Sequence, residues 1–206
     1  MHGFLHDSYT QDNDFLLDYF KNLPAGRALA IGANQGTNNP TYELIKRGWK
    51  AVCCEPDPFA VGLLIELLKE YQANVTIVNS AITPTTGQLT PFYLSIGRSA
   101  MSSLRADWLA TQDAIPNDEK QQQQILTHPV SFQDLLNYVG TDFDLVVIAV
   151  EGIDAELIKS IDWTQLSKCQ LVCVEDPGDS PYKLGLAGFE LYHRTVMNYY
   201  YKKTEK

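Results

Sequence analysis

The stretch "ALAIGANQG", residues 28–36, is the most informative short segment of this 206-residue chain. Its first residues have the small and branched apolar side chains of a buried strand, and its end is a loop bracketed by Gly32 and Gly36. Glycine tolerates positive φ angles and lets a ligand come close to the backbone. The loop therefore predicts either a tight turn or a surface against which a cofactor lies.

Strands and helices alternate after this stretch. A helix over residues 38–48, with Asn39 as its cap, is followed by a second buried strand over residues 49–55. An amphipathic helix over residues 57–72 and a third strand over residues 75–82 continue the pattern. This order predicts an α/β fold with a doubly wound, mainly parallel sheet, whose ligand binds at the carboxyl ends of the strands.

The whole chain, residues 1–206, fits a single domain, because no internal repeat is visible in it. The N-terminal segment, residues 1–25, predicts a helix that starts at Asp12, with aspartate as its cap. The later predicted elements are a helix over residues 131–139 capped by Ser131, strands over 143–150 and 169–175, a helix over 154–161, and two antiparallel strands within 188–203.

Two parts of the middle have a weaker pattern. Residues 83–95 surround Gly87 and predict a small hairpin. Residues 98–128 contain serines, a proline and the polar run "KQQQQ", which cannot bury a face. That second segment predicts a variable surface loop or an active-site lid, and it is the expected acceptor region.

Composition argues against several classes of function. The chain is 45% hydrophobic and has a formal charge of -9, so neither nucleic acid nor an anionic membrane is an expected partner. No apolar run approaches the roughly 20 residues that a membrane span needs. The four cysteines lie in apolar runs without metal-ligand or disulfide spacing, which predicts buried thiols in a reducing compartment. We expect a cytoplasmic protein.

Polar or glycine-rich residues follow each predicted parallel strand. Glu55 ends the second strand, where an acidic side chain accepts hydrogen bonds from both hydroxyls of a ribose. Together with Gly32 and Gly36, Glu55 predicts a nucleoside-containing cofactor, either a dinucleotide or S-adenosylmethionine. The loop lacks the G-x-G-x-x-G pattern because position 34 is Asn, and this disfavours a pyrophosphate.

The motifs along the chain together resemble one family. They are "IGANQG" at residues 31–36, "CCEPDP" at 53–58, "VSFQDLL" at 130–136, "FDLVVIAVEGIDAELIKSIDW" at 143–163 and "LVCVE" at 171–175. Over nearly its whole length the chain is similar to the FkbM family of S-adenosylmethionine-dependent methyltransferases. The resemblance implies a class I methyltransferase (Rossmann-like) fold of seven strands, the last antiparallel. It also implies O-methylation of a hydroxyl on a sugar, a glycan or a small metabolite.

The same resemblance implies a set of cofactor-binding residues. They are Ala30, Gly32, Ala33, Asn34 and Gly36 around the first loop, Glu55 and Pro56 after the second strand, Ser80 and Ala81 near the adenine, and Ala149 and Glu151 after the fourth strand. The family usually has aspartate where this chain has Ala30 and Ala149. A hydrogen bond to a charged group contributes about 1.5–3 kcal/mol, so the cofactor's ammonium is expected to bind about ten-fold more weakly, or worse, per lost carboxylate.

Methyl transfer to an alcohol requires that the two reactants are aligned and that the hydroxyl loses a proton. Glu151 directly follows the fourth strand and is the first candidate base, although the same position also suits a helix cap. The weaker candidates are Asp154, Glu175, Asp176 and His193. His193 also fits, and fits better, an ordinary strand residue beside the terminal hairpin. The oxygens of Glu151, Asp154, Glu175 and Asp176 are of the kind that holds Mg²⁺, but the residues lack a metal-ligand spacing, so no metal ion is expected.

The acceptor contacts are predicted from the middle of the chain. Ser102, Ser103, Arg105 and Trp108 combine hydroxyl, guanidinium and indole groups, which suit hydrogen bonding and stacking of a sugar ring. An equal alternative is that Trp108 anchors a long loop to the core.

Two other functions remain open. Ala30 and Ala149 also fit a catalytically impaired descendant that binds the cofactor weakly or binds a partner protein. Glu55 and the α/β order fit a nicotinamide-dependent oxidoreductase, against which the imperfect glycine pattern and the terminal pair of strands argue.

Overall fold

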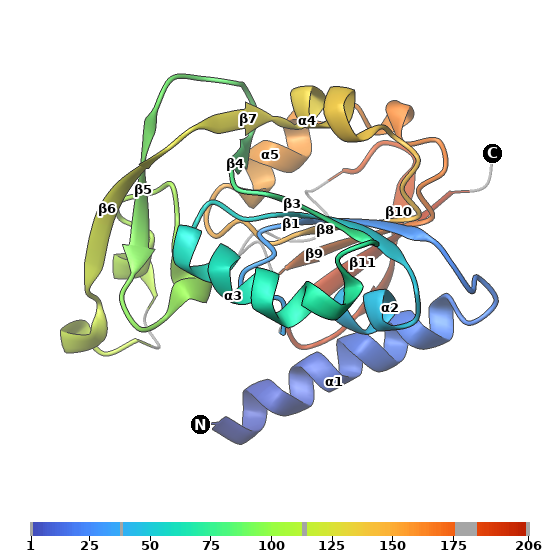
Figure 1. Cartoon of the computed structure of the whole chain (residues 1–206), viewed down its shortest axis with the longest axis horizontal. Coiled ribbons are helices and arrows are strands. Elements are labelled where there is room, and N and C mark those ends of the chain that lie inside the picture. The colour runs from blue at the N-terminus through green and yellow to red at the C-terminus, as the bar shows by residue number, and fades with distance from the viewer. Residues whose placement is uncertain (1, 38, 113–114, 176–184, 205–206) are drawn as a thin grey trace.

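The sheet that the sequence predicts is present in the computed structural model, which describes residues 2–37, 39–112, 115–175 and 185–204 (Figure 1). Within these residues the main sheet has seven strands in the order β10-β11-β9-β8-β1-β2-β3. They are β1 (Arg27–Ile31), β2 (Lys50–Cys54), β3 (Val75–Val78), β8 (Leu145–Ile148), β9 (Leu171–Glu175), β10 (Phe189–Arg194) and β11 (Asn198–Lys203). β11 pairs antiparallel with β9 and β10, and the other pairs are parallel. The predicted sheet with an antiparallel last strand is confirmed.

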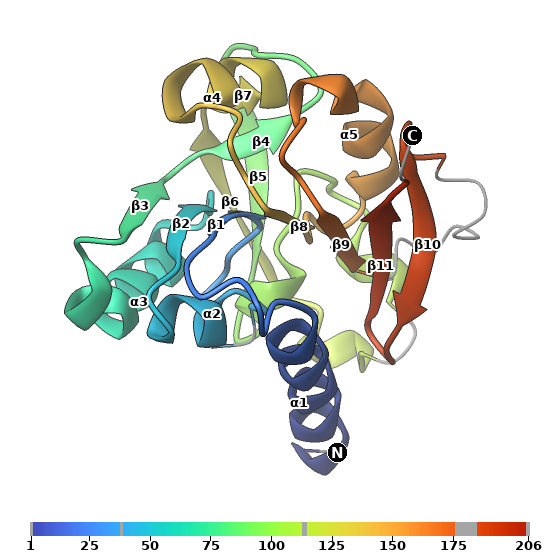
Figure 2. The same cartoon turned by 90° about the vertical axis from the view of Figure 1, so that its right-hand side faces the viewer.

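Helices cover both faces of this sheet (Figures 1 and 2). Their bounds are α1 (His2–Tyr19), α2 (Tyr42–Lys46) and α3 (Pro58–Leu68) on one face, and α4 (Phe132–Val139) and α5 (Asp154–Ser160) on the other. Alternate residues of β1 face the two layers. Leu29 packs in a cluster with Leu157 of α5, whereas Ala30 packs in a cluster with Leu64 of α3. β1 is therefore buried on both faces, which explains its unbroken apolar sequence.

The N-terminal helix begins earlier than predicted. α1 starts at His2, so Asp12 lies inside the helix instead of capping it, and its side chain is fully buried. The Asp12 carboxylate accepts hydrogen bonds from the Thr195 hydroxyl at 2.6 Å, the Asn198 amide at 2.8 Å and the Tyr200 hydroxyl at 2.7 Å. Asp12 thus attaches α1 to β11, and a capping pattern cannot reveal partners from the far end of the chain.

The middle of the chain differs from both predictions made for it. No hairpin forms within residues 83–95, because β4 (Ala81–Thr83) pairs with β7 (Pro129–Ser131) and β5 (Thr90–Ser95) pairs with β6 (Gln122–Thr127). Three glutamines of the polar run, Gln122, Gln123 and Gln124, form the first half of β6, and they are exposed. Backbone hydrogen bonds to β5 stabilise this strand, so it needs no buried face. The movement of this segment as a lid stays a prediction.

The cysteines and one helix cap agree with the sequence predictions. Cys53, Cys54, Cys169 and Cys173 are buried and form no disulfide. Burial raises the pKa of the Cys53 and Cys169 thiols to about 12, so these side chains act as small apolar groups. Ser131 caps α4 as predicted. In the part of the chain that the structure describes, no helix combines the length and the apolar character needed to cross a membrane.

Candidate functional site

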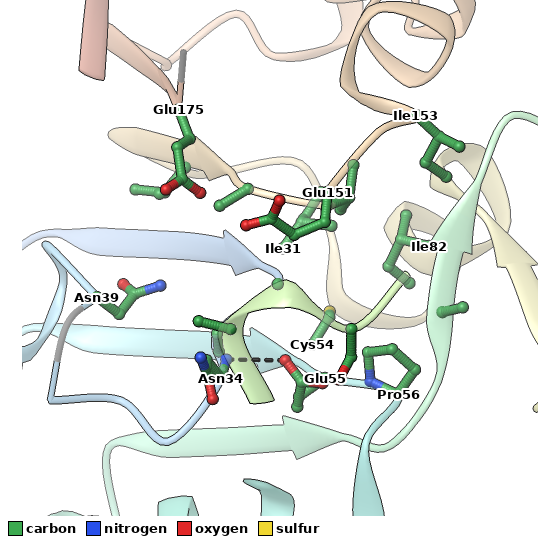
Figure 3. Close-up of a pocket in the computed structure, with 18 of the residues that line it drawn as sticks. Ile31, Asn34, Asn39, Cys54, Glu55, Pro56, Ile82, Glu151, Ile153 and Glu175 are labelled. Carbon is green, nitrogen blue, oxygen red and sulfur yellow. Dashed lines mark hydrogen bonds between the residues drawn. The ribbon is translucent and has the colours of Figure 1, made fainter. Parts of the chain in front are cut away.

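A cavity opens at the carboxyl ends of the parallel strands, at the edge where the sequence predicts a ligand (Figure 3). Its walls come from the loops after β1, β2 and β8, from the end of β9, from the start of β11 and from the segment after β5. With the open space at its mouth, the cavity encloses about 910 Å³. Segments that are far apart in the sequence therefore meet at one site.

Glu55 directly follows β2 and is only 6% exposed. One carboxylate oxygen accepts a hydrogen bond from the backbone N–H of Asn34, and the other accepts one from the backbone N–H of Asp57, both at 2.8 Å. Burial raises the pKa of Glu55 to about 7. The two backbone bonds fix the carboxylate at the cavity wall, and each oxygen can accept a further hydrogen bond from a ligand hydroxyl.

The two glycines of the first loop are required by packing within the protein. Gly32 has a φ of +78°, and a side chain there would overlap the backbone carbonyl oxygen of Ala149 after β8. Gly36 has a φ of +87°, and a Cβ atom there would lie 2.6 Å from Cδ1 of Leu64 in α3. Both interpretations of the loop therefore hold in part, because its glycines permit tight packing and the loop also forms a wall of the cavity.

The backbone N–H groups of this loop already have partners. Those of Gly32 and Ala33 donate to the carbonyl oxygen of Cys54, at 2.9 and 3.0 Å. The next three donate to the carboxylate of Glu55, to the side-chain oxygen of Asn34 and to the carbonyl oxygen of Ala33. The loop therefore lacks the row of free N–H groups with which a glycine-rich loop binds a pyrophosphate.

Glu151 lies in the loop after β8, in a left-handed backbone conformation with a φ of +51°. Its carboxylate accepts a hydrogen bond from the indole N–H of Trp108 at 2.9 Å. The indole packs over Gly152, where a Cβ atom would lie 2.7 Å from the ring. The Ser103 hydroxyl donates to the backbone carbonyl oxygen of Glu151. Two contacts from the segment after β5 thus hold Glu151 in place.

Glu151 and Glu175, at the end of β9, direct their carboxylates into the same space (Figure 3). Burial, together with the charges of Glu175 and Asp154, raises the pKa of Glu151 to about 9, so Glu151 keeps a proton at neutral pH. Asp154 itself accepts hydrogen bonds from the backbone N–H groups of Val150 at 2.9 Å and Gly152 at 3.2 Å. Asp154 therefore orders the loop that positions Glu151.

The segment after β5 also contacts the first loop. The Ser99 hydroxyl donates to the side-chain oxygen of Asn34 at 3.1 Å and accepts a hydrogen bond from the Gln35 amide at 2.9 Å. Arg105, in contrast, is exposed and forms an ion pair with Asp107 at 2.9 Å. This segment therefore joins the loop after β1 to the loop after β8 across the cavity.

Most of the predicted cofactor residues line the cavity. They are Gly32, Ala33, Asn34, Glu55, Pro56, Ser80, Ala81, Ala149 and Glu151. Gly36 packs on α3 instead, and Ala30 is fully buried in the apolar cluster that includes Leu64 and Leu68. Position 30 therefore does not contribute to the cavity wall.

Only some of the predicted catalytic and acceptor residues line the cavity. Glu151 and Ser102 line the cavity, whereas Asp154, Ser103, Arg105 and Trp108 are not among its lining residues. The prediction for His193 needs correction, because its imidazole stacks on Phe15 of α1, with the ring centroids 4.1 Å apart, on the edge strand β10. Asp176 lies outside the described residues.

Several cavity residues were not predicted from the sequence, among them Asn39, Phe92 and Asn198. The sequence predicts Asn39 only as a helix cap, and this is wrong, because α2 begins at Tyr42 with Thr41 as its N-cap residue. The side-chain oxygen of Asn39 accepts hydrogen bonds from the backbone N–H and the hydroxyl of Thr41. Asn39 follows the predicted cofactor loop, and a side-chain amide at such a position indicates a possible ligand contact. Phe92 and Asn198 gave no such signal, because β5 and β11 reach the cavity only through the tertiary fold.

Comparison with solved structures identifies the fold. The Escherichia coli protein yhhF, a candidate methyltransferase, is 14% identical, and the match covers 94% of this chain and 85% of that chain with a TM-score of 0.50. This chain has the class I methyltransferase fold. A precorrin-6y C5,15-methyltransferase from Geobacter metallireducens is also 14% identical, with 93% and 87% covered and a TM-score of 0.49. A candidate RNA methyltransferase from Pyrococcus horikoshii is 13% identical, with 95% and 81% covered and a TM-score of 0.49.

No protein-family model matches the chain, and no curated protein matches its sequence. Membership of the FkbM family therefore stays a prediction.

Glu151 should make the stability of the protein depend on pH. Its pKa of about 9 exceeds the ordinary value of 4.5, so the folded protein keeps a proton that the unfolded chain loses. The resulting stabilisation is complete below about pH 4.5 and is lost as the pH rises through about 9, at up to about 1.4 kcal/mol per pH unit. We expect urea denaturation to show that the free energy of unfolding falls less between pH 7 and pH 9 in Glu151→Gln than in the native protein.

The control for this prediction is Glu156→Gln, because Glu156 is an exposed carboxylate of α5. Glu156→Gln should keep the native pH dependence. An unchanged pH dependence in Glu151→Gln would contradict the assignment of a bound proton to Glu151.

Proposed function

We propose that this protein is an S-adenosylmethionine-dependent methyltransferase. The observation that carries the proposal is the position of Glu55, a buried carboxylate directly after β2 that borders the cavity of a class I methyltransferase sheet. A carboxylate at this position accepts hydrogen bonds from the two ribose hydroxyls of a nucleoside cofactor. The loop after β1 borders the same cavity, as a cofactor loop must.

The residues of the cavity fit this cofactor along its length. Glu55 suits the ribose, and Ser80 and Ile82 offer polar and apolar surface for the neighbouring adenine. The small side chain of Ala149 leaves room beside Gly32 for the methionine end. A dinucleotide fits less well, because the N–H groups of the loop bond within the protein and leave a pyrophosphate without donors.

We further propose that the acceptor is a hydroxyl of a sugar, a glycan or a small metabolite, as the resemblance to the FkbM family implies. When bound, S-adenosylmethionine supplies an electrophilic methyl group. The protein must then orient the hydroxyl and accept its proton. Glu151 at the cavity wall is the base that we propose, in the ionised form that the positive charge of the bound cofactor favours. Among the described lining residues none is basic, which favours a neutral acceptor over a phosphate-bearing one.

Isothermal titration calorimetry tests the cofactor. S-adenosylmethionine and S-adenosylhomocysteine, titrated separately, should bind with micromolar dissociation constants, and NAD should not bind. Binding of NAD alone would replace the proposal with a nicotinamide-dependent function. Absence of binding by all three would favour a protein that keeps the fold for another purpose.

A further inference from the structure

The cavity has an acidic end. Glu151, after β8, and Glu175, at the end of β9, direct their carboxylates into the same space (Figure 3). β8 and β9 are neighbours in the sheet, and β1 separates them from β2, which Glu55 follows. The acidic end therefore lies beyond the cofactor loop as seen from the proposed ribose position. No lysine, arginine or histidine lines the cavity within the described ranges.

A buried amide donor borders the same space. Asn39 is 9% exposed, and its side-chain oxygen already accepts two hydrogen bonds from Thr41, at 3.0 and 2.6 Å. Its side-chain nitrogen has no hydrogen-bond partner among the residues that the structure describes, and Figure 3 shows this nitrogen directed into the cavity. Because this N–H group faces the cavity, it can donate a hydrogen bond to an oxygen that a ligand presents to Asn39.

One end of the proposed cofactor complements both features. S-adenosylmethionine carries an α-amino acid, with an ammonium and a carboxylate on the same carbon. With the ribose on Glu55, this end extends past Gly32 toward β8 and β9. The ammonium then meets carboxylates and the carboxylate meets an amide donor, and both kinds of contact are charge-assisted hydrogen bonds.

We propose that Glu175, with Glu151 beside it, holds the ammonium of the cofactor's amino-acid end, while Asn39 donates to its carboxylate. The inference rests on the proposed function, because it assumes S-adenosylmethionine. The pair supplies negative charge at the part of the cavity that Ala149 also lines, where the resembled family has an aspartate.

The release of the proton from Glu151 is a second measurable consequence of ammonium binding. Three groups face its carboxylate: Glu175 from β9, Asp154 from α5 and the Trp108 indole N–H from the segment after β5. Arg105 lies near this loop, but its guanidinium is paired with Asp107. A bound ammonium favours the ionised form of a neighbouring carboxylate, so binding of the amino-acid end at pH 7 should release a proton from Glu151.

Calorimetry with two ligands tests the assignment. S-adenosylhomocysteine has the amino-acid end, whereas 5′-methylthioadenosine has the same nucleoside without it. We expect Glu175→Gln to bind S-adenosylhomocysteine about ten-fold more weakly, or worse, and to bind 5′-methylthioadenosine as the native protein does. Asn39→Asp keeps the side-chain oxygen that accepts hydrogen bonds from Thr41 and removes the N–H donor. It should therefore also bind S-adenosylhomocysteine more weakly and 5′-methylthioadenosine as the native protein does. Glu70→Gln, at an exposed glutamate, is the matched control and should change neither affinity.

Repeating the titrations in buffers of different ionisation enthalpy measures the number of protons that ligand binding releases. S-adenosylhomocysteine should release more protons at pH 7 than 5′-methylthioadenosine, because both ligands bring a ribose to Glu55 but only S-adenosylhomocysteine brings an ammonium to Glu151. Equal proton release by the two ligands would contradict the placement of the ammonium beside Glu151.

Binding of 5′-methylthioadenosine by each variant checks that its nucleoside site is folded. The inference is overturned if both variants bind S-adenosylhomocysteine as the native protein does, or if they bind both ligands equally weakly. The proposed function would still stand in either case. If the native protein binds neither ligand, the proposed function fails and the inference fails with it.

Discussion

Replacing Gly32 with alanine is expected to lower the free energy of unfolding by about 2 to 5 kcal/mol and to abolish cofactor binding. At a φ of +78° a Cβ atom is strained in any surroundings, and here it would also overlap the carbonyl oxygen of Ala149. That oxygen belongs to the backbone, so no side-chain rotation relieves the overlap, and the ends of β1 and β8 must separate at the floor of the cavity. Urea denaturation measures the first effect and calorimetry with S-adenosylhomocysteine measures the second.

The matched control is Gly188→Ala. Gly188 has a φ of +82°, and a Cβ atom there would meet no atom within 4 Å. This variant has the backbone strain without the overlap, so its free energy of unfolding should fall by only about 1 kcal/mol. Equal losses of unfolding free energy in the two variants would mean that the close approach of Gly32 to the Ala149 carbonyl oxygen does not make the substitution costly.

Introducing the aspartate of the resembled family at position 30 is expected to destabilise the protein by about 3 kcal/mol or more, without raising its affinity for S-adenosylhomocysteine. Ala30 is fully buried on the α3 side of β1, among the apolar side chains that include Cys53, Leu64 and Leu68. A carboxylate there would lose its hydration and would not reach the cavity, which Ala30 does not line.

Ala149→Asp is the control for this prediction, because Ala149 lines the cavity and is only partly buried. A carboxylate there keeps its hydration, so the loss of stability should stay below about 1 kcal/mol. If Ala30→Asp binds S-adenosylhomocysteine more tightly than the native protein, the side chain at position 30 reaches the cofactor and our description of this site is wrong.

Several parts of the site could be predicted from short patterns. Gly32 and Glu55 were predicted because each directly follows an apolar strand, and parallel strands bring such positions to one edge of the sheet. His193 was misplaced because the sequence does not say that β10 is the edge strand, where its imidazole stacks on Phe15. The strand β6 was missed because exposed glutamines have no apolar period to detect.

Local patterns in the sequence predict the alternation of strands and helices, the antiparallel last strand and the edge of the sheet where the cavity opens. These features follow from local apolar runs, glycines and polar strand ends, and the pattern of each element is complete within a few residues. The tertiary structure alone decided that Trp108 holds Glu151, that Glu175 faces it and that Asp12 holds Asn198 at the cavity wall. Such contacts, and the raised pKa of Glu151 that depends on them, arise from short distances between distant segments, and no local pattern specifies those distances.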